Sequence, residues 1–264
     1  MHSFATLPHS AAELLKVTGT GSSSRLFSYL PLAHVAERCV IEMQSFYTGA
    51  SITFNRCRDS FLDDLRAVRP DFLFAVPRIW TNLKSQIVNE HGKDLWERLI
   101  SAPEADKKKG PAILAGLGLD AVTFAFSGGA PISSTDIRAW HGLGMPLFES
   151  YGQSEVLSGT VNQRGQGRPG SVGKTFAASA RLKLSDEGEI LLSGPDIMLG
   201  YYKDTERTAQ TVVDGWVHTG DKGRIDDDGF LYITGRLKEI FKTSSGKYRS
   251  EEHTSELQSQ NRIS

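Results

Sequence analysis

The chain has 264 residues and is close to neutral, with 30 Lys and Arg against 31 Asp and Glu. This balance excludes a protein-wide field that would attract nucleic acid or an anionic membrane. A hydrophobic content of 39% is too high for an intrinsically disordered chain. The length permits one large domain or two smaller ones.

The two cysteines, Cys39 and Cys57, form no Cys-x-x-Cys motif and accompany no paired histidines. This argues against a zinc site and against a disulfide framework. No apolar run approaches the ~20 residues that a membrane-spanning helix needs, and the first residues lack the pattern of a signal peptide. We therefore expect a cytoplasmic protein.

From residue 50 to residue 151, β-rich runs alternate with apolar residues at helical spacing. The predicted strands lie at 50–54, 71–76, 121–126 and 146–151. The predicted helices lie at 61–68, 79–88 and 134–143, the last capped by Ser133 or Ser134. This alternation predicts a parallel sheet with flanking helices. The lysine-containing segment 101–118 is expected to be a surface connection.

After Gly170 the pattern changes to short alternating runs separated by tight turns. The runs lie at 181–184, 189–193, 223–225 and 230–234. They predict a mostly antiparallel β region that follows the α/β region.

Two candidate binding turns follow predicted strands. Ser127-Gly-Gly-Ala-Pro131 contains glycines that permit close approach to a flat ligand such as a base. Tyr151-Gly-Gln-Ser-Glu155 groups an aromatic face, a hydroxyl and a carboxylate, which suit base stacking, phosphate contact and magnesium binding. Taken singly, each motif also fits a purely structural turn or polar loop.

Two later motifs each place one ionisable residue among glycines. Asp221 ends Gly215-Trp-Val-His-Thr-Gly-Asp221, and Arg236 lies in Gly235-Arg-Leu-Lys-Glu239. An aspartate and an arginine suit two sugar hydroxyls. Either motif alone is more typical of a turn or a surface ion pair.

In this order and spacing, the four motifs resemble the acyl-adenylating (AMP-binding) superfamily, which includes acyl-CoA synthetases, peptide-synthetase adenylation domains and firefly-type luciferases. The resemblance extends to Leu30-Pro-Leu-Ala-His34, Arg168-Pro-Gly-Ser-Val-Gly173 and Gly200-Tyr201, so it covers nearly the whole chain. Within the superfamily, the segments 28–38 and 216–221 are most similar to long-chain fatty-acid:CoA ligases.

The resemblance implies roles for the matching residues. Tyr151 would stack on adenine, Ser154 would contact the α-phosphate in place of the usual threonine, and Glu155 would hold Mg²⁺. Ser154 and Glu155 are the expected catalytic residues. The full set expected at the nucleotide is Gly129, Ala130, Tyr151, Gly152, Ser154, Asp221 and Arg236, the last two at the ribose.

Two further roles follow from the same resemblance. His34 would lie near the acyl pocket, and Lys238 would be the hinge of a small C-terminal domain. The implied reaction is attack of a fatty carboxylate on the α-phosphate of ATP, which expels pyrophosphate, followed by attack of the CoA thiol on the acyl-adenylate. ATP, Mg²⁺, CoA and a fatty acid are the expected ligands, with no nucleic acid.

Other functions fit the same residues. The chain could belong to a ligase for shorter or aromatic carboxylic acids, or be a non-catalytic adenylate-binding fragment. A lipid substrate also suggests peripheral contact with a membrane.

The resemblance divides the chain into an incomplete α/β acyl- and adenine-binding subdomain at 1–169, an antiparallel β subdomain at 170–235 and a hinge at 236–248. The family's phosphate loop ending in Pro-Lys-Gly, and the C-terminal domain with its catalytic lysine, do not occur in the sequence. Residues 249–259 match, residue for residue, the translation of a common sequencing adapter, so we expect 249–264 to be artificial. We accordingly expect a ligase fragment that is inactive by itself.

Overall fold

The computed structural model describes residues 1–102, 106–237, 241–242 and 248–249. Its centre is a seven-stranded sheet with the order β2-β1-β3-β4-β5-β6-β7. The parallel strands are β1 (Arg25–Ser28), β2 (Ser51–Phe54), β3 (Phe72–Ala75), β4 (Phe124–Ser127) and β5 (Leu147–Gln153). The antiparallel strands are β6 (Val156–Val161) and β7 (Lys174–Thr175).

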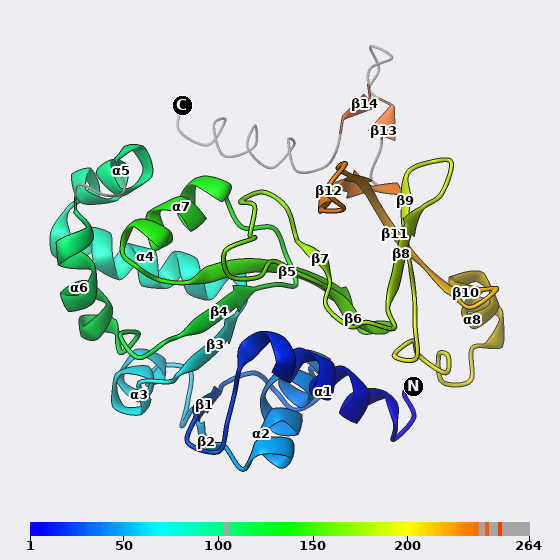
Figure 1. Ribbon diagram of the computed structural model, residues 1–264, viewed down its shortest axis with the longest axis horizontal. Helices are drawn as coiled ribbons and strands as arrows, with labels where there is room; N and C mark the ends of the chain where they lie inside the picture. Colours follow the sequence, from blue (N-terminus) through cyan, green and yellow to red (C-terminus); the bar gives the residue numbers. More distant parts are fainter. Residues whose placement is uncertain (103–105, 238–240, 243–247, 250–264) are drawn as a thin grey trace.

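Helices cover both faces of this sheet (Figure 1). On one face lie α3 (Phe61–Val68), α4 (Pro77–His91), α5 (Lys93–Ser101), α6 (Gly110–Leu117) and α7 (Ser134–Gly142), with the short 3-10 turn η2 (Lys107–Lys109) before α6. On the other face lie α1 (Thr6–Thr18), the π-helical turn η1 (Glu37–Glu42) and α2 (Met43–Thr48).

The local signals in the sequence explain where these helices begin. Pro77 occupies the first turn of α4, where its missing N–H is not needed for helical hydrogen bonding. The Ser133 hydroxyl caps α7 by accepting the Thr135 N–H. The predicted strands and helices between 50 and 151 each overlap an observed element of the same type, so these predictions are confirmed.

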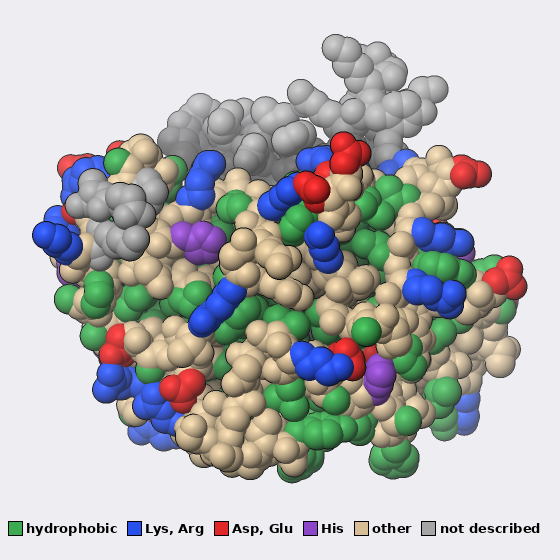
Figure 2. Space-filling model, in the orientation of Figure 1, with side chains coloured by type: hydrophobic (Ala, Val, Ile, Leu, Met, Phe, Trp, Pro, Cys, Tyr) green, Lys and Arg blue, Asp and Glu red, His purple; other side chains and the backbone are tan. Residues whose placement is uncertain are grey.

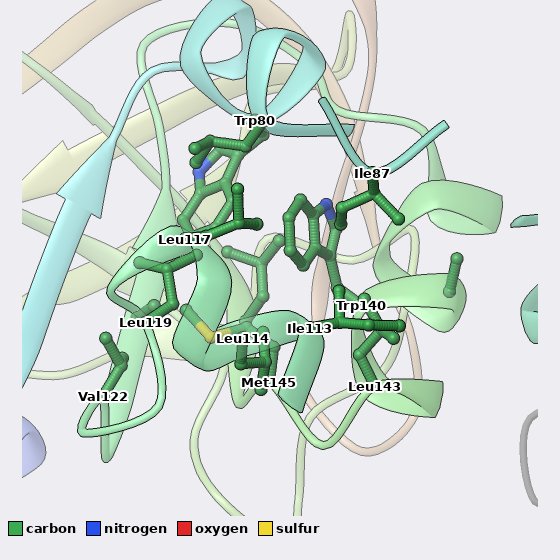
Figure 3. Close-up of a cluster of buried hydrophobic side chains, with 14 of the residues drawn as sticks. Trp80, Ile87, Ile113, Leu114, Leu117, Leu119, Val122, Trp140, Leu143 and Met145 are labelled. Atoms are coloured by element: carbon green, nitrogen blue, oxygen red, sulfur yellow. The ribbon is translucent and has the colours of Figure 1, made fainter. Parts of the chain in front are cut away.

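The larger hydrophobic core lies between the sheet and helices α3 to α7 (Figure 3). Its largest members are tryptophans: the Trp140 ring lies 5.3 Å from the Trp80 ring and 5.5 Å from the Trp96 ring, both edge to face. Such aromatic pairs add to the free energy gained by burying their large apolar surface. The core therefore fixes the helices behind β3, β4 and β5.

The expectation of a surface connection at 101–118 is wrong. Residues 110–117 form α6, which buries Ile113, Leu114 and Leu117 in this core. The helix can pack closely because a Cβ on Gly110 would lie only 2.0 Å from the carbonyl oxygen of Leu143. The helix was not predicted because it is short and directly follows the polar lysine run.

A second, antiparallel sheet has the order β10-β11-β9-β8, with β12 paired to β11. Its strands are β8 (Arg181–Leu184), β9 (Glu189–Ser193), β10 (Val212–Val213), β11 (Trp216–Ile225) and β12 (Leu231–Arg236). The helix α8 (Thr205–Thr211) comes directly before β10. A short separate pair, β13 (Phe241–Lys242) and β14 (Tyr248–Arg249), follows. The predicted fold class, a parallel α/β region followed by antiparallel β structure, is confirmed.

A smaller core joins the two sheets. Val156 of β6 packs with Leu192 of β9 and Val217 of β11, and the Tyr151 ring lies against this cluster. The end of β5 is thereby held beside the second sheet.

The surface carries basic and acidic side chains interspersed with hydrophobic ones on the face seen in Figure 2. Among the described residues, no helix is both long and apolar enough to cross a membrane.

Candidate functional site

A cavity of about 1230 Å³ opens beyond the carboxyl ends of β4 and β5 and extends to β11 of the second sheet. Parallel α/β sheets commonly bind ligands at this end. The lining includes most of the residues expected from the sequence: His34, Gly129, Tyr151, Gly152, Ser154, Glu155, Asp221 and Arg236. Ala130 is exposed and is not among the lining residues. Lys238 and residues 250–264 lie outside the described part of the chain.

The glycines that follow β4 allow the backbone to form the cavity wall. A Cβ on Gly128 would lie 2.6 Å from the Ser150 hydroxyl of β5, so a larger residue would displace the Ser150 side chain. Gly129 adopts a φ of +82°, which side-chain-bearing residues rarely adopt. The turn therefore presents bare backbone to the cavity.

Tyr151 and Asp221 connect the two sheets across the cavity. The Tyr151 hydroxyl donates to Asp221 Oδ2 at 2.7 Å, and Gln153 Nε2 donates to the same oxygen at 2.8 Å. Arg236 Nε lies 3.2 Å from Asp221 Oδ1. Burial and the adjacent Asp221 carboxylate raise the pKa of Tyr151, so its hydroxyl remains a donor.

Ser154 and Glu155 occupy the turn between β5 and β6, at the polar side of the cavity. Glu155 Oε1 accepts the Tyr201 hydroxyl at 2.7 Å. Among the described residues, no three or more His, Cys, Asp or Glu side chains gather into a group that could hold a metal ion. A single carboxylate nevertheless fits Mg²⁺, which usually keeps several waters and takes further ligands from substrate phosphates.

His34 lies in the turn before η1, and its Nδ1 accepts the Ala36 N–H at 3.2 Å. Part of the cavity lining is apolar and belongs to one hydrophobic cluster, here called the apolar end. The residues of this apolar end are Leu14, Val35, Cys39, Val40, Phe74, Phe126, Leu157, Val161 and Phe176.

Sequence reasoning assigned no role to Gln153 or Tyr201, although both lie inside motifs that it identified. Gln153 donates to Asp221 and, at 2.9 Å, to the Thr219 carbonyl oxygen. Tyr201 holds Glu155. Their partners lie 46 to 68 positions away in sequence, a pairing that motif spacing does not reveal.

The profile of AMP-binding enzymes matches residues 1–202, which is most of the chain. The chain belongs to the AMP-binding enzyme family. Among its relatives is the long-chain-fatty-acid–CoA ligase FadD15 of Mycobacterium bovis, which is 32% identical over 84% of this chain and 41% of the relative. The chain thus spans less than half the length of the curated relatives it matches.

Solved AMP-binding and related structures have the same fold. The chain is similar to ATP-bound MatB from Rhodopseudomonas palustris with a TM-score of 0.73 and 26% identity, covering 97% of this chain and 49% of MatB. It also resembles o-succinylbenzoate CoA synthetase from Bacillus subtilis in complex with ATP and magnesium, with a TM-score of 0.72, 20% identity and coverage of 94% and 49%. The second similarity concerns the fold alone.

Proposed function

We propose that this chain carries the adenylate- and acyl-binding parts of an ATP-dependent long-chain fatty-acid:CoA ligase. The observation that carries the proposal is that one cavity has a polar end, built around Tyr151 and Asp221, and an apolar end lined by phenylalanines. Its volume of about 1230 Å³ exceeds the roughly 300–1,000 Å³ of common small-molecule pockets. Both halves of an acyl-adenylate would fit one continuous space.

In this proposal the polar end binds AMP. Adenine lies against the backbone of the Gly128–Gly129 turn and stacks on Tyr151, while Asp221 and Arg236 take the ribose hydroxyls. Asp221 is already oriented by Tyr151 and Gln153, so the site is preformed before the ligand enters.

The Ser154 hydroxyl and the Glu155 carboxylate would act at the phosphates. Ser154 donates to the α-phosphate, and Glu155 binds Mg²⁺, which would supply positive charge against the phosphate oxygens. The fatty carboxylate attacks the α-phosphorus, the bond to the bridging oxygen of the β-phosphate breaks, and pyrophosphate leaves. The CoA thiol then attacks the acyl carbonyl and AMP leaves. Residues 236–248, including Lys238, would form the hinge to a further domain.

The apolar end supports a long acyl chain over the alternatives. Nine apolar side chains, contributed by α1, by the segment around η1, by the sheet and by Phe176, can enclose a hydrocarbon tail. Each buried CH₂ contributes about 0.8 kcal/mol at most. Ligases for shorter or aromatic acids remain the second candidate, since the same apolar side chains could enclose a smaller acid.

Calorimetric titration of the chain with AMP and with non-hydrolysable benzoyl-, hexanoyl- and palmitoyl-adenylates tests the proposal. We expect affinity to rise steadily from AMP to the palmitoyl compound. Tightest binding of the benzoyl compound would favour the aromatic alternative, and absence of AMP binding would contradict the nucleotide site. Pyrophosphate release from ATP and palmitate by the chain alone would contradict the expectation that it is an inactive, adenylate-binding fragment.

Peripheral membrane contact is part of the proposal because the substrate is a lipid. Co-sedimentation of the chain with neutral and anionic liposomes tests it, and recovery of the chain only in the supernatant would remove it.

A further inference from the structure

β11 contains a bulge at the cavity wall. Its residues Val217 and His218 pair with Leu192 and Leu191 of β9, but the next pair is Lys222 with Glu189. Residues 219–221 are therefore displaced from the ladder with β9, while Asp221 still pairs with Arg236 of β12. Bulges commonly turn a side chain toward a functional site. Here the displaced segment carries Asp221 into the cavity.

One carboxylate holds this bulge. Glu189 Oε1 accepts the Gly220 N–H at 2.8 Å, and Glu189 Oε2 accepts from His218 Nδ1 at 2.8 Å. The side chain is only 13% exposed. Hydrogen bonds to an ionised acceptor are stronger than neutral ones. Glu189 therefore holds the bulge through one backbone amide, that of Gly220, and one side chain, that of His218.

The bulge must be held firmly because Asp221 has to reach a different sheet. Its carboxylate meets Tyr151 and Gln153 of β5, and Gly220 adopts a φ of +72° just before it. Thr219 Oγ1 adds a bond to the Ile190 carbonyl oxygen at 2.7 Å. Without Glu189, the Gly220 amide would lose its acceptor and the bulge could relax toward regular pairing.

We propose that Glu189 is a positioning residue for Asp221: by holding the Gly220 amide and the His218 imidazole, it fixes the bulge that presents Asp221 to the nucleotide. This inference rests on the proposed role of Asp221 at the ribose hydroxyls. Glu189 acts through the backbone, because both of its oxygens are occupied by Gly220 and His218 and no hydrogen bond between Glu189 and Asp221 occurs in the described chain.

The test compares AMP with 2′,3′-dideoxy-AMP, which lacks both ribose hydroxyls, by calorimetric titration of the full chain. We expect the unaltered chain to prefer AMP. Glu189→Ala should weaken AMP binding about tenfold, which corresponds to roughly 1.4 kcal/mol. Its affinity for 2′,3′-dideoxy-AMP should equal that of the unaltered chain. Glu187→Ala is the matched control, since it removes an exposed carboxylate two residues earlier and should change neither affinity.

A double-mutant cycle separates positioning from general stabilisation. In an Asp221→Ala background, Glu189→Ala should cause no further loss of AMP affinity, because the group it positions is gone. An equal tenfold loss in that background, or equal weakening of both nucleotides, would overturn the proposal. An unaltered chain that binds both nucleotides equally would instead contradict the ribose role of Asp221.

Hydrogen exchange provides a readout that needs no ligand. Exchange at the 216–224 segment should accelerate in Glu189→Ala and stay unchanged in Glu187→Ala. If Glu189→Ala does not fold, Glu189→Gln keeps one acceptor for the Gly220 amide and should give an intermediate loss of AMP affinity. Unchanged exchange in Glu189→Ala, or unchanged AMP affinity in both Glu189 variants, would overturn the proposal.

Discussion

Tyr151 illustrates how one residue combines two separable contributions in the proposed site. It lines the cavity where the base is proposed to stack, and its hydroxyl orients Asp221. Tyr151→Phe removes only the hydroxyl, with its short bond to Asp221 and its longer bond from Gln153. We expect AMP affinity to fall about fivefold, consistent with roughly 1 kcal/mol for the loss of the Asp221 bond. Tyr151→Ala also removes stacking, which contributes about 1–3 kcal/mol per base, and should weaken AMP binding about a hundredfold. Calorimetric titration measures both.

The ratio between the two Tyr151 variants is informative. Equal losses for Tyr151→Phe and Tyr151→Ala would mean that the ring does not stack on the base. Because Tyr151 also packs on the smaller core, the melting temperature of each variant should be measured alongside its affinity.

Glu149 predicts a pH dependence of stability. Burial raises its pKa to about 7, and the Gly170 N–H donated to it at 2.8 Å offsets this only in part. The folded chain therefore binds this proton more tightly than an unfolded glutamate with a pKa of 4.5. The protonated Glu149 therefore adds to the free energy of unfolding, fully below about pH 4.5. This contribution, roughly 3 kcal/mol, is lost as the pH rises through 7.

Glu149→Gln should remove this dependence, because the neutral amide can still accept the Gly170 N–H. We expect the fall in melting temperature between pH 5 and pH 8 to be smaller in this variant than in the unaltered chain by roughly 5–10 °C. The exposed Glu187→Gln serves as control. Identical pH profiles for Glu149→Gln and the unaltered chain would contradict the assignment.

At the residue scale, the sequence motifs predicted which residues line the cavity. They did not predict the hydrogen bonds that these residues form with one another. Motif positions 151, 154, 155, 221 and 236 all line it. The bonds from Gln153 to Asp221 and from Tyr201 to Glu155 depend on two distant segments meeting in space. Nothing local to either motif encodes that meeting.

At the scale of elements, the close approach of β5 and β6 depends on Gly159. A Cβ at this position would lie 1.9 Å from the Tyr151 carbonyl oxygen. Gly159→Ala should therefore separate the strands, destabilise the chain by about 2–3 kcal/mol and weaken AMP binding. Urea unfolding followed by circular dichroism measures the first effect.

Gly116 in α6 offers a matched control, since a Cβ there would meet no atom within 4 Å. Gly116→Ala should be neutral or stabilise the chain by up to about 1 kcal/mol. A Gly159→Ala chain as stable as the unaltered one would show that the strands can adjust.

The elements that the sequence predicted are those with local signals. Pro77 and Ser133 mark helix starts, and the buried runs at 72–75 and 124–127 mark strands. The helix α6 was missed because it is short and follows a lysine run, and the bulge in β11 was missed because it depends on the register with β9. Register is a property of two strands, which one strand's sequence does not specify.

At the scale of the whole molecule, β2 is the outer strand of the large sheet in the described chain. Phe54 on this strand is 61% exposed, and Phe46 and Tyr47 of the neighbouring α2 are exposed as well. Figure 2 shows hydrophobic side chains at the lower edge of the molecule, where Figure 1 places α2. An exposed strand edge beside apolar side chains favours self-association.

Phe54→Lys should reduce this self-association by placing a charge on the strand edge. Sedimentation velocity at several chain concentrations measures the change. Phe4→Lys introduces the same charge at a fully exposed phenylalanine outside any strand and should leave association unchanged. Equal effects of the two substitutions would indicate that net charge, and not the strand edge, controls association.

The cluster of Val156, Leu192 and Val217 between the sheets has a consequence for interpreting variants of this chain. A ligand that contacts both Tyr151 of β5 and Asp221 of β11 depends on how the two sheets are held relative to one another. A cavity created in that cluster would change affinity without altering any group near the ligand. Screens for loss of binding should therefore return interior apolar positions as well as residues that contact the ligand.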